Sequence, residues 1–511
     1  MSAKLRVFSA ALFQSLLGNC AYYHWGALNN IEPLVQEFIK NSTSAKDAAQ
    51  ANWFWSLSSS ACQAGYCLAA LMLGYLADRL GRKNTVIVAK NVIVVISCLL
   101  QYAAQPFNNV ALLIVGRLLA GIGITFTWLL PVFLAECSPP KYRGLMSAFA
   151  SVGTSLWVMI GLTCGLPVVL GERNTWQYVF LVPIIPAIVH MLSAFYLPES
   201  PKYLYLVKKD EKQFLKSVKF YRGDKAQLEQ LKHALDQEAE LTASTDPTAG
   251  WMEILRTRHY RWSFLLSLLV FATIPLGGPD LTTQYSTQVL LSLGLEATLV
   301  SYVSAYMFQG PAILLILMGS FMLVDRFGRK TLLLTGMVTN ICGLVLIFCT
   351  KFATNQLANG IVSILGFLLL TGGNCTGPFT MGPFLPAEMC PQAIRSKTVA
   401  AGIFVDGALS FVTIFSFPPM LQAIGTYAVA PLVVLDLICF LLLLAYLPET
   451  KGKSVEGVVS EWIEPEKEEP DEKEPLLRLR KFVSGSRYDM ESLAGDIPVV
   501  LLGLMHPRRP P

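Results

Sequence analysis

The chain has 511 residues, of which 53% are hydrophobic and only 15% are charged, and its mean hydropathy is +0.49. A soluble protein usually contains about 25% charged residues, so this composition excludes an ordinary cytosolic enzyme and indicates a membrane protein. The formal net charge of +5 is small. We expect neither an enzyme activity nor a nucleic-acid partner.

The apolar residues fall into about twelve runs, each close to the length of about 20 residues that a helix needs to cross a bilayer. The first run is not followed by an obvious signal-peptide cleavage site, so we expect it to be retained as a helix. The approximate starts of the runs are residues 7, 54, 86, 110, 145, 177, 260, 299, 331, 358, 398 and 424.

Basic residues are concentrated in the short loops around Arg82 and Arg329 and in the stretch 202–258. By the positive-inside rule these loops are cytoplasmic, which places both termini in the cytoplasm. The loop between the first and second helices then faces outward. It contains the sequon Asn41-Ser42-Thr43, so Asn41 is a predicted glycosylation site.

The chain shows no sign of metal or nucleotide chemistry. Its 11 cysteines lie in or beside apolar runs without a Cys-x-x-Cys pair, which predicts core residues and no metal site. A Gly-x-x-x-x-Gly-Lys-Ser/Thr loop is missing from the sequence, which argues against an ATP-driven pump. We therefore expect no cofactor, and energy from solute or ion gradients.

Three short charged patterns occur once in each half of the chain, about 250 residues apart. Such a duplication predicts two six-helix halves with a substrate site between them near the membrane midplane. The predicted fold is thus an all-α membrane protein of twelve transmembrane helices. Its predicted parts are an amino-terminal half (1–197), a cytoplasmic helical linker (198–258), a carboxy-terminal half (259–452) and a disordered cytoplasmic tail (453–511).

Five segments together resemble the sugar-porter (glucose-transporter-like) family of the major facilitator superfamily, over roughly residues 10 to 455. The resemblance implies a solute carrier that moves a hexose or related sugar or polyol by alternating access. The segments are Gly74 to Lys83, Gly116-Arg117, Glu136 to Gly144, Pro198 to Leu204 and Leu447 to Gly452.

Charged residues at the predicted cytoplasmic helix ends can pair across the seams between helices. The resemblance implies that they form an intracellular network that holds the outward-facing state and opens when the inward side opens. The alternative is that these charges only set topology and helix ends, but their matched spacing in two halves favours gating. We call the following gating residues the latch: Asp78, Arg82, Arg117, Glu136, Arg143, Glu199, Asp325, Arg329, Glu388, Arg395 and Glu449.

The predicted substrate pocket departs from the family pattern. In the family, helices five, seven and ten supply amide and aromatic side chains to the sugar, whereas the matching positions here include Ile274-Pro275 in helix seven. Loss of these amides removes directional bonds to hydroxyls, so the pattern does not favour high-affinity glucose binding. The predicted substrate-binding residues are His24, Ser151, Asp280, Gln284, Tyr285, Asn374, Pro383 and Asp406. The Gly377-Pro378 and Gly382-Pro383 steps predict a broken, flexible helix ten.

Three ionisable groups in the apolar runs leave the cargo and the coupling open. Asp280 and Asp406 can bind a cation or share a proton, which makes a carrier of organic cations or zwitterions the first alternative; their other role is structural hydrogen bonding. His24 stands where proton-coupled relatives have Asp and uniporters have Asn, so it is either a proton-coupling group or a helix contact. A non-transporting nutrient receptor is the second alternative.

The tail after Lys453 is rich in Glu, Lys and Pro and is predicted to be disordered. It contains an acidic dileucine pattern formed by Glu472, Leu476 and Leu477. Clathrin adaptors read such patterns, so the tail predicts endosomal or lysosomal sorting as the alternative to plasma-membrane residence.

Overall fold

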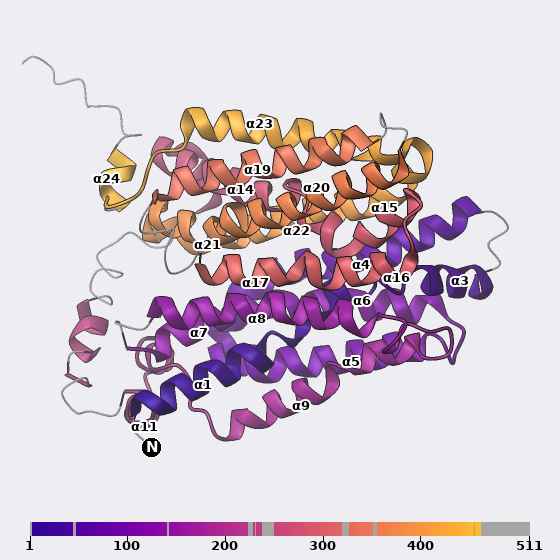
Figure 1. Cartoon of the computed structure of the whole chain (residues 1–511). Coiled ribbons are helices and arrows are strands. Elements are labelled where there is room, and N and C mark those ends of the chain that lie inside the picture. Colours follow the sequence, from indigo (N-terminus) through magenta and orange to yellow (C-terminus); the bar gives the residue numbers. More distant parts are fainter. Residues whose placement is uncertain are drawn as a thin grey trace, which may run out of the picture. The chain divides into compact units, whose positions relative to one another are not determined.

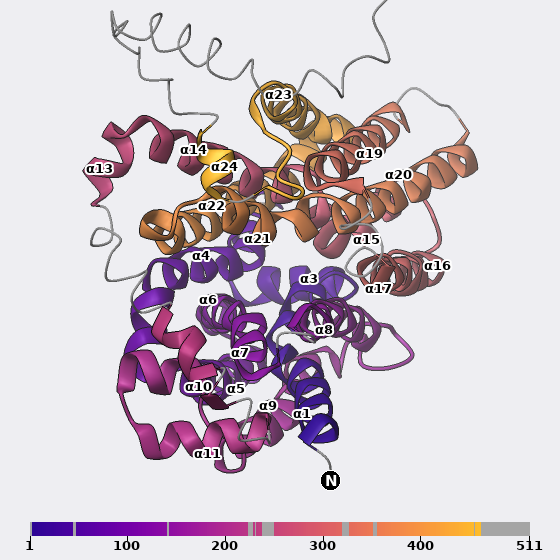
Figure 2. The same cartoon turned by 90° about the vertical axis from the view of Figure 1, so that its left-hand side faces the viewer.

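A computed structural model describes residues 3–43, 48–139, 143–222, 228–229, 231–237, 250–318, 327–350, 355–453 and 455–460, all of them within the unit Met1–Trp462. The described residues form helices joined by turns. Two groups of helices lie side by side, the first coloured indigo to magenta and the second red to yellow (Figure 1), and a view rotated by 90° shows the same division (Figure 2).

The amino-terminal group contains the first six predicted apolar runs. Its helices are α1 (Ala3–Gly18), η1 (Cys20–Tyr22), α2 (Tyr23–Gly26), α3 (Glu32–Ser42), α4 (Ala48–Leu80), η2 (Asn84–Ala89), α5 (Lys90–Ala103), α6 (Val110–Thr127), α7 (Leu129–Cys137), α8 (Arg143–Cys164), η4 (Trp176–Leu181), α9 (Ile184–Leu192) and η5 (Ser193–Phe195).

The carboxy-terminal group contains the other six runs. Its helices are α14 (Arg258–Leu276), η7 (Leu281–Tyr285), α15 (Ser286–Ser292), α16 (Ala297–Tyr302), η8 (Val303–Met307), α17 (Gln309–Met318), α19 (Arg329–Cys349), α20 (Gln356–Thr376), α21 (Pro378–Met389), α22 (Gln392–Ile424), η11 (Gly425–Val429) and α23 (Ala430–Tyr446). The two groups pack against each other through α4 with α22 and through α8 with α17.

Nine helical ranges in the described residues are long and apolar enough to cross a membrane, and one of them joins α22 and α23. Their outer faces carry large apolar side chains, such as Val434 and Leu441 of α23, which are 55% and 54% exposed. A soluble protein would bury such a surface, whereas lipid accepts it.

Short helices connect the two groups in the predicted linker, as expected from its charged, amphipathic sequence. They are α10 (Pro201–Tyr203), η6 (Leu204–Lys208), α11 (Glu211–Tyr221) and α13 (Trp251–Arg256). We call the end of the bundle where α11 lies the latch end, and the opposite end, where α3 lies, the α3 end (Figure 1).

The predicted disorder from residue 453 is wrong at its start, because α24 (Val455–Ser460) forms a helix there. Val458 is fully buried in the main core, and α24 packs on α14 and α21. The burial of this apolar side chain offsets the entropic cost of ordering the turn.

The predicted break in helix ten is confirmed at Gly377, which separates α20 from α21, whereas α21 continues through Gly382. A Cβ atom at Gly377 would lie 2.8 Å from the Cα atom of Gly336 in α19. Only glycine allows the two backbones to approach this closely.

Candidate functional site

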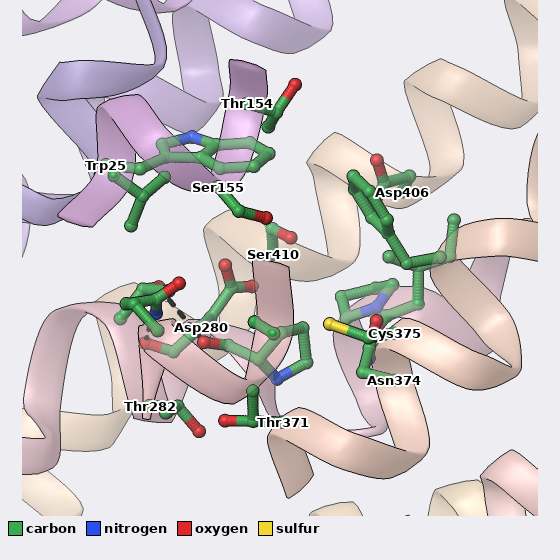
Figure 3. A pocket seen from close by; sticks show the side chains of 18 of the residues that line it. Trp25, Thr154, Ser155, Asp280, Thr282, Thr371, Asn374, Cys375, Asp406 and Ser410 are labelled. Carbon is green, nitrogen blue, oxygen red and sulfur yellow. Dashed lines mark hydrogen bonds between the residues drawn. The ribbon is translucent and has the colours of Figure 1, made fainter. Parts of the chain in front are cut away.

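A cavity lies between the two halves, a place where small-molecule sites are common. Both halves contribute to its lining (Figure 3). Its polar lining residues are Gln63, Tyr66, Thr154, Ser155, Asp280, Thr282, Thr283, Gln309, Thr371, Asn374, Asp406 and Ser410, and the aromatic rings of Trp25, Trp128 and Phe379 line it as well.

Asp280 reaches the cavity because its helix is interrupted. Pro275 lies in the last turn of α14, and Gly278 has a φ of +83°, a conformation that favours glycine. Helical structure resumes at Pro279, and the π-helical segment η7 begins directly after Asp280. Asp280 is 9% exposed, and its Oδ2 atom has no hydrogen-bond partner among the described residues. Asp280 thus lines the cavity with a carboxylate that has one buried oxygen atom left without a partner.

Asp406 lies on the other side of the same cavity, in α22 (Figure 3). The hydroxyl group of Tyr66 in α4 donates a hydrogen bond of 2.9 Å to its Oδ2 atom. Because α4 and α22 belong to different halves, this bond joins the halves at the cavity wall. Asp406 is recognisable in the sequence as an acid in an apolar run, whereas Tyr66 is not, because its only signal is a hydroxyl within an apolar helix.

Amide and hydroxyl groups surround the two acids. Both amide atoms of Gln63 are buried without a hydrogen-bond partner in the part of the chain that the structure describes. Asn374 donates a hydrogen bond of 3.0 Å to the carbonyl oxygen of Ile274, which fixes its orientation beside the interrupted helix. The sequence-based expectation that loss of the family's amides disfavours high-affinity glucose binding did not include Gln63, Thr154 and Gln309, which also line the cavity.

Three of the predicted substrate-binding residues line this cavity: Asp280, Asn374 and Asp406. Ser151 lies in α8 one turn before Ser155, which does line it. Gln284 and Tyr285 are buried outside the lining, and the Tyr285 hydroxyl donates a hydrogen bond of 2.8 Å to the carbonyl oxygen of Ile414. Pro383 is part of α21, but its side chain is outside the described residues.

His24 is also buried outside the cavity lining. Its ring nitrogen atoms lie 3.6 Å from Cys98 Sγ and 3.4 Å from Gln101 Nε2. The guanidinium of Arg117 donates hydrogen bonds to the backbone carbonyl oxygens of His24 and Ser59. Arg117 therefore lies with His24 and apart from the other described latch residues.

Hydrogen bonds between the halves close the bundle beside α3. Asn29 of the first half donates a hydrogen bond of 2.9 Å to Ser286 and accepts one of 3.2 Å from the backbone N–H of Thr287. The hydroxyl of Thr287 donates to Asn30 at 2.8 Å. All these residues are at least nine-tenths buried. The α3 end is thus sealed by a polar network between α2–α3 and α15.

The first-half latch forms at the turn between α4 and η2. Arg82 lies 3.1 Å from Asp78 and 3.8 Å from Glu136, and Glu136 also accepts a hydrogen bond from Ser200. Glu199 accepts the backbone N–H of Lys83 at 2.8 Å. Burial raises the pKa of Glu199, while this bond and nearby cations oppose the rise.

The second-half latch repeats this arrangement. Arg329 lies 3.1 Å from Glu388, which accepts a hydrogen bond from Thr450 as Glu136 does from Ser200. Glu449 accepts the backbone N–H of Arg329 at 3.0 Å. Among the described residues, every latch ion pair stays within one half.

The remaining latch residues are less well defined. Arg395 donates hydrogen bonds of 3.2 and 3.1 Å to the carbonyl oxygen of Cys390. Arg143 begins α8, but its side chain is outside the described residues, as is the whole of Asp325.

The predicted glycosylation site and the predicted sorting motif differ in whether the structure describes them. Asn41 is exposed near the end of α3. The dileucine residues Glu472, Leu476 and Leu477 lie outside the described residues.

Two groups of membrane-spanning helices, a cavity lined by both groups and duplicated charged turns define a membrane carrier of the major facilitator fold. Residues 10–462 match the model of the family described as "Sugar (and other) transporter". The chain therefore belongs to the sugar (and other) transporter family and is an integral, multi-pass membrane transporter.

Several facilitated glucose transporters resemble the chain over most of its length. It is 26% identical to the solute carrier family 2, facilitated glucose transporter member 9 of Pongo abelii, over 84% of this chain and 76% of the relative. It is also 26% identical to a facilitated glucose transporter homolog of Caenorhabditis elegans, over 85% of this chain and 86% of the relative. The solute carrier family 2, facilitated glucose transporter member 5 of Rattus norvegicus is 25% identical, over 88% of this chain and 90% of the relative.

Solved structures share the fold. The proton:xylose symporter XylE bound to 6-bromo-6-deoxy-D-glucose has a TM-score of 0.71 at 19% identity, over 90% of this chain and all (100%) of that one. The inward open conformation of XylE from E. coli also gives a TM-score of 0.71, at 18% identity over 89% and 100% of the two chains.

Proposed function

We propose that this transporter carries a hexose or a related polyol across the membrane by alternating access through the central cavity. The observation that carries this proposal is the lining itself, in which hydroxyl, amide and carboxylate groups from both halves face one cavity. A sugar presents several hydroxyls, each of which needs a directional partner when buried. Gln63 and Asp280 line the cavity, and each has a buried polar atom without a hydrogen-bond partner in the described residues; we propose that these groups turn toward the sugar when it binds.

A second candidate cargo is an organic cation or zwitterion. Asp280 and Asp406 face the same cavity, and the lining contains no lysine, arginine or histidine in the described residues. A cationic group between two carboxylates would be stabilised by both. The hexose proposal uses these carboxylates as hydrogen-bond acceptors, so the two candidates differ in whether the negative charge is essential.

The test is uptake of radiolabelled glucose, fructose, inositol and a small quaternary amine into proteoliposomes that contain the purified chain. We expect saturable uptake of at least one hexose and none of the amine. Uptake of the amine alone would replace the hexose proposal by the cation carrier, and silence on all four solutes would favour the receptor alternative.

Proton coupling is a separate proposal that rests on His24, beside Arg117. If His24 couples protons, uptake should change between about pH 5.5 and 7.5, around the ordinary titration range of histidine. His24→Asn should remove that dependence. Identical pH profiles of the parent and the variant would end the proposed role of His24.

We also propose that both termini are cytoplasmic and that Asn41 carries glycan on the outer side. Glycosidase treatment should then shift the mobility of the parent but not of Asn41→Gln.

For the tail, replacing Leu476 and Leu477 by alanine should increase the plasma-membrane fraction if adaptors sort the protein to endosomes or lysosomes. An unchanged distribution would indicate plain plasma-membrane residence.

A further inference from the structure

A second cavity lies at the latch end of the first half. It is separate from the central cavity, because the two share no lining residue. Its walls come from the end of α4, the end of η5, η6 and α11. Five basic side chains line it: Arg79, Lys83, Lys208, Lys216 and Lys219.

The charge in this second cavity is strongly one-sided. Among the described lining residues the one acid is Glu199, whose Oε1 atom already accepts the backbone N–H groups of Lys83 and Ser200, each at 2.8 Å. Burial lowers the pKa of Lys83, Glu199 opposes that effect, and the ammonium groups of Lys208 and Lys216 lower the pKa further. The lysines therefore converge closely enough to repel one another.

Helix α11, which carries Lys216 and Lys219, is held in place by hydrogen bonds and a ring contact. The hydroxyl of Ser217 donates a 2.6 Å hydrogen bond to the carbonyl oxygen of Glu199, and that of Tyr221 donates one of 3.0 Å to Pro198. The rings of Tyr196 and Phe220 meet edge to face at 5.4 Å. These contacts fix α11 against the end of the sixth membrane helix, so the lysines are presented from a defined surface.

The rim of the cavity carries aromatic side chains that are exposed on the surface of the helix bundle. Phe195 and Tyr196 line the cavity and are 91% and 70% exposed at the end of the sixth membrane helix. Exposed aromatic side chains at a helix end are typical of the membrane–water interface. A ligand in this cavity can therefore contact lysines and lipid tails at the same time.

We propose that this cavity binds the phosphorylated headgroup of an anionic phospholipid of the phosphoinositide type, from the leaflet at the latch end. The lysines would hold the phosphate groups, Asn84 and Gln213 would face the headgroup, and the acyl chains would lie along Phe195 and Tyr196. A free inositol phosphate has the same headgroup chemistry but nothing to place on the aromatic rim. Basic pockets between membrane helices on the cytoplasmic side are suited to such headgroups.

The test is native mass spectrometry of the delipidated full-length chain, titrated separately with phosphatidylinositol bisphosphate, phosphatidylserine, phosphatidylcholine and soluble inositol trisphosphate. Near an anionic surface each lysine contributes about 1 kcal/mol, or roughly fivefold in affinity. The triple variant Lys208→Gln/Lys216→Gln/Lys219→Gln should therefore bind phosphatidylinositol bisphosphate about a hundredfold more weakly. Lys212→Gln is the matched control, because Lys212 is exposed on α11 but does not line the cavity.

A further variant distinguishes the lipid from a soluble anion. Phe195→Ser/Tyr196→Ser should weaken binding of the lipid and leave binding of inositol trisphosphate unchanged. Binding of inositol trisphosphate without the lipid would overturn the proposal in favour of a soluble ligand. Equal binding of phosphatidylserine and the phosphoinositide, or equal losses in the triple variant and Lys212→Gln, would reduce the effect to general surface charge and also overturn it.

Discussion

Removal of the Asp280 carboxylate should weaken hexose transport through binding. Its Oδ2 atom is an acceptor in the central cavity without a hydrogen-bond partner in the described chain. A hydrogen bond to a charged group contributes about 1.5–3 kcal/mol. Asp280→Ala should therefore raise the KM for hexose about 10- to 150-fold, whereas Asp280→Asn, which keeps an acceptor, should change it less than about tenfold.

The assay is the initial rate of radiolabelled hexose uptake into proteoliposomes, normalised to the reconstituted protein. Asp436→Ala is the control, because Asp436 is a fully buried acid in α23 outside the cavity lining. An unchanged KM for Asp280→Ala, or an equal rise for Asp436→Ala, would refute the role of Asp280. Complete loss of transport in Asp280→Asn would instead show that the charge is essential, as a cationic cargo requires.

Three further predictions concern the latch, the α3 end and the broken helix. Glu388→Gln removes the partly exposed ion pair with Arg329, which contributes about 1 kcal/mol or less. The variant should lower kcat at constant KM in the same uptake assay. A change in KM alone would contradict a gating role. Burial raises the pKa of Glu32 from 4.5 to about 8. The neutral carboxyl therefore contributes its full stabilisation below pH 4.5, and this contribution is lost as the pH rises through about 8. Glu32→Gln should flatten the pH dependence of Tm over this window in scanning fluorimetry, and parallel curves would contradict the assignment. Gly377→Ala places a Cβ atom 2.8 Å from the facing backbone of α19 and should destabilise the protein by about 1–3 kcal/mol. Gly372→Ala is the control, because its nearest contact would be a side chain at 3.7 Å and its Tm should not fall. Equal Tm values for the two variants would argue against the close approach.

The fold could be predicted from the sequence because its two main signals are local. A run of about 20 apolar residues reports a membrane helix without knowledge of its neighbours. The repeated charged turns then divide the helices into halves, and the contacts of Arg82 and Arg329 repeat accordingly. The start of the tail was missed because a single buried residue, Val458, orders α24.

The cavity could be predicted only in part because its wall depends on helix phase and on contacts between distant residues. Asp280 and Asp406 stand out as acids in apolar segments. Tyr66 and Gln63 do not, since a tyrosine or glutamine in a helix says nothing about the side it faces until α4 is packed on α22. The interruption of α14 at Gly278 then decides which residues of helix seven reach the cavity.

The most direct test of the central claim, alternating access of a hexose through the central cavity, is counterflow. Proteoliposomes preloaded with excess unlabelled hexose are diluted into trace labelled hexose, and the internal label is followed with time. A carrier that alternates between two sides predicts a transient accumulation of label above equilibrium, strongly reduced in Asp280→Ala. Monotonic equilibration without an overshoot at any preload, despite hexose uptake by the parent, would contradict the account.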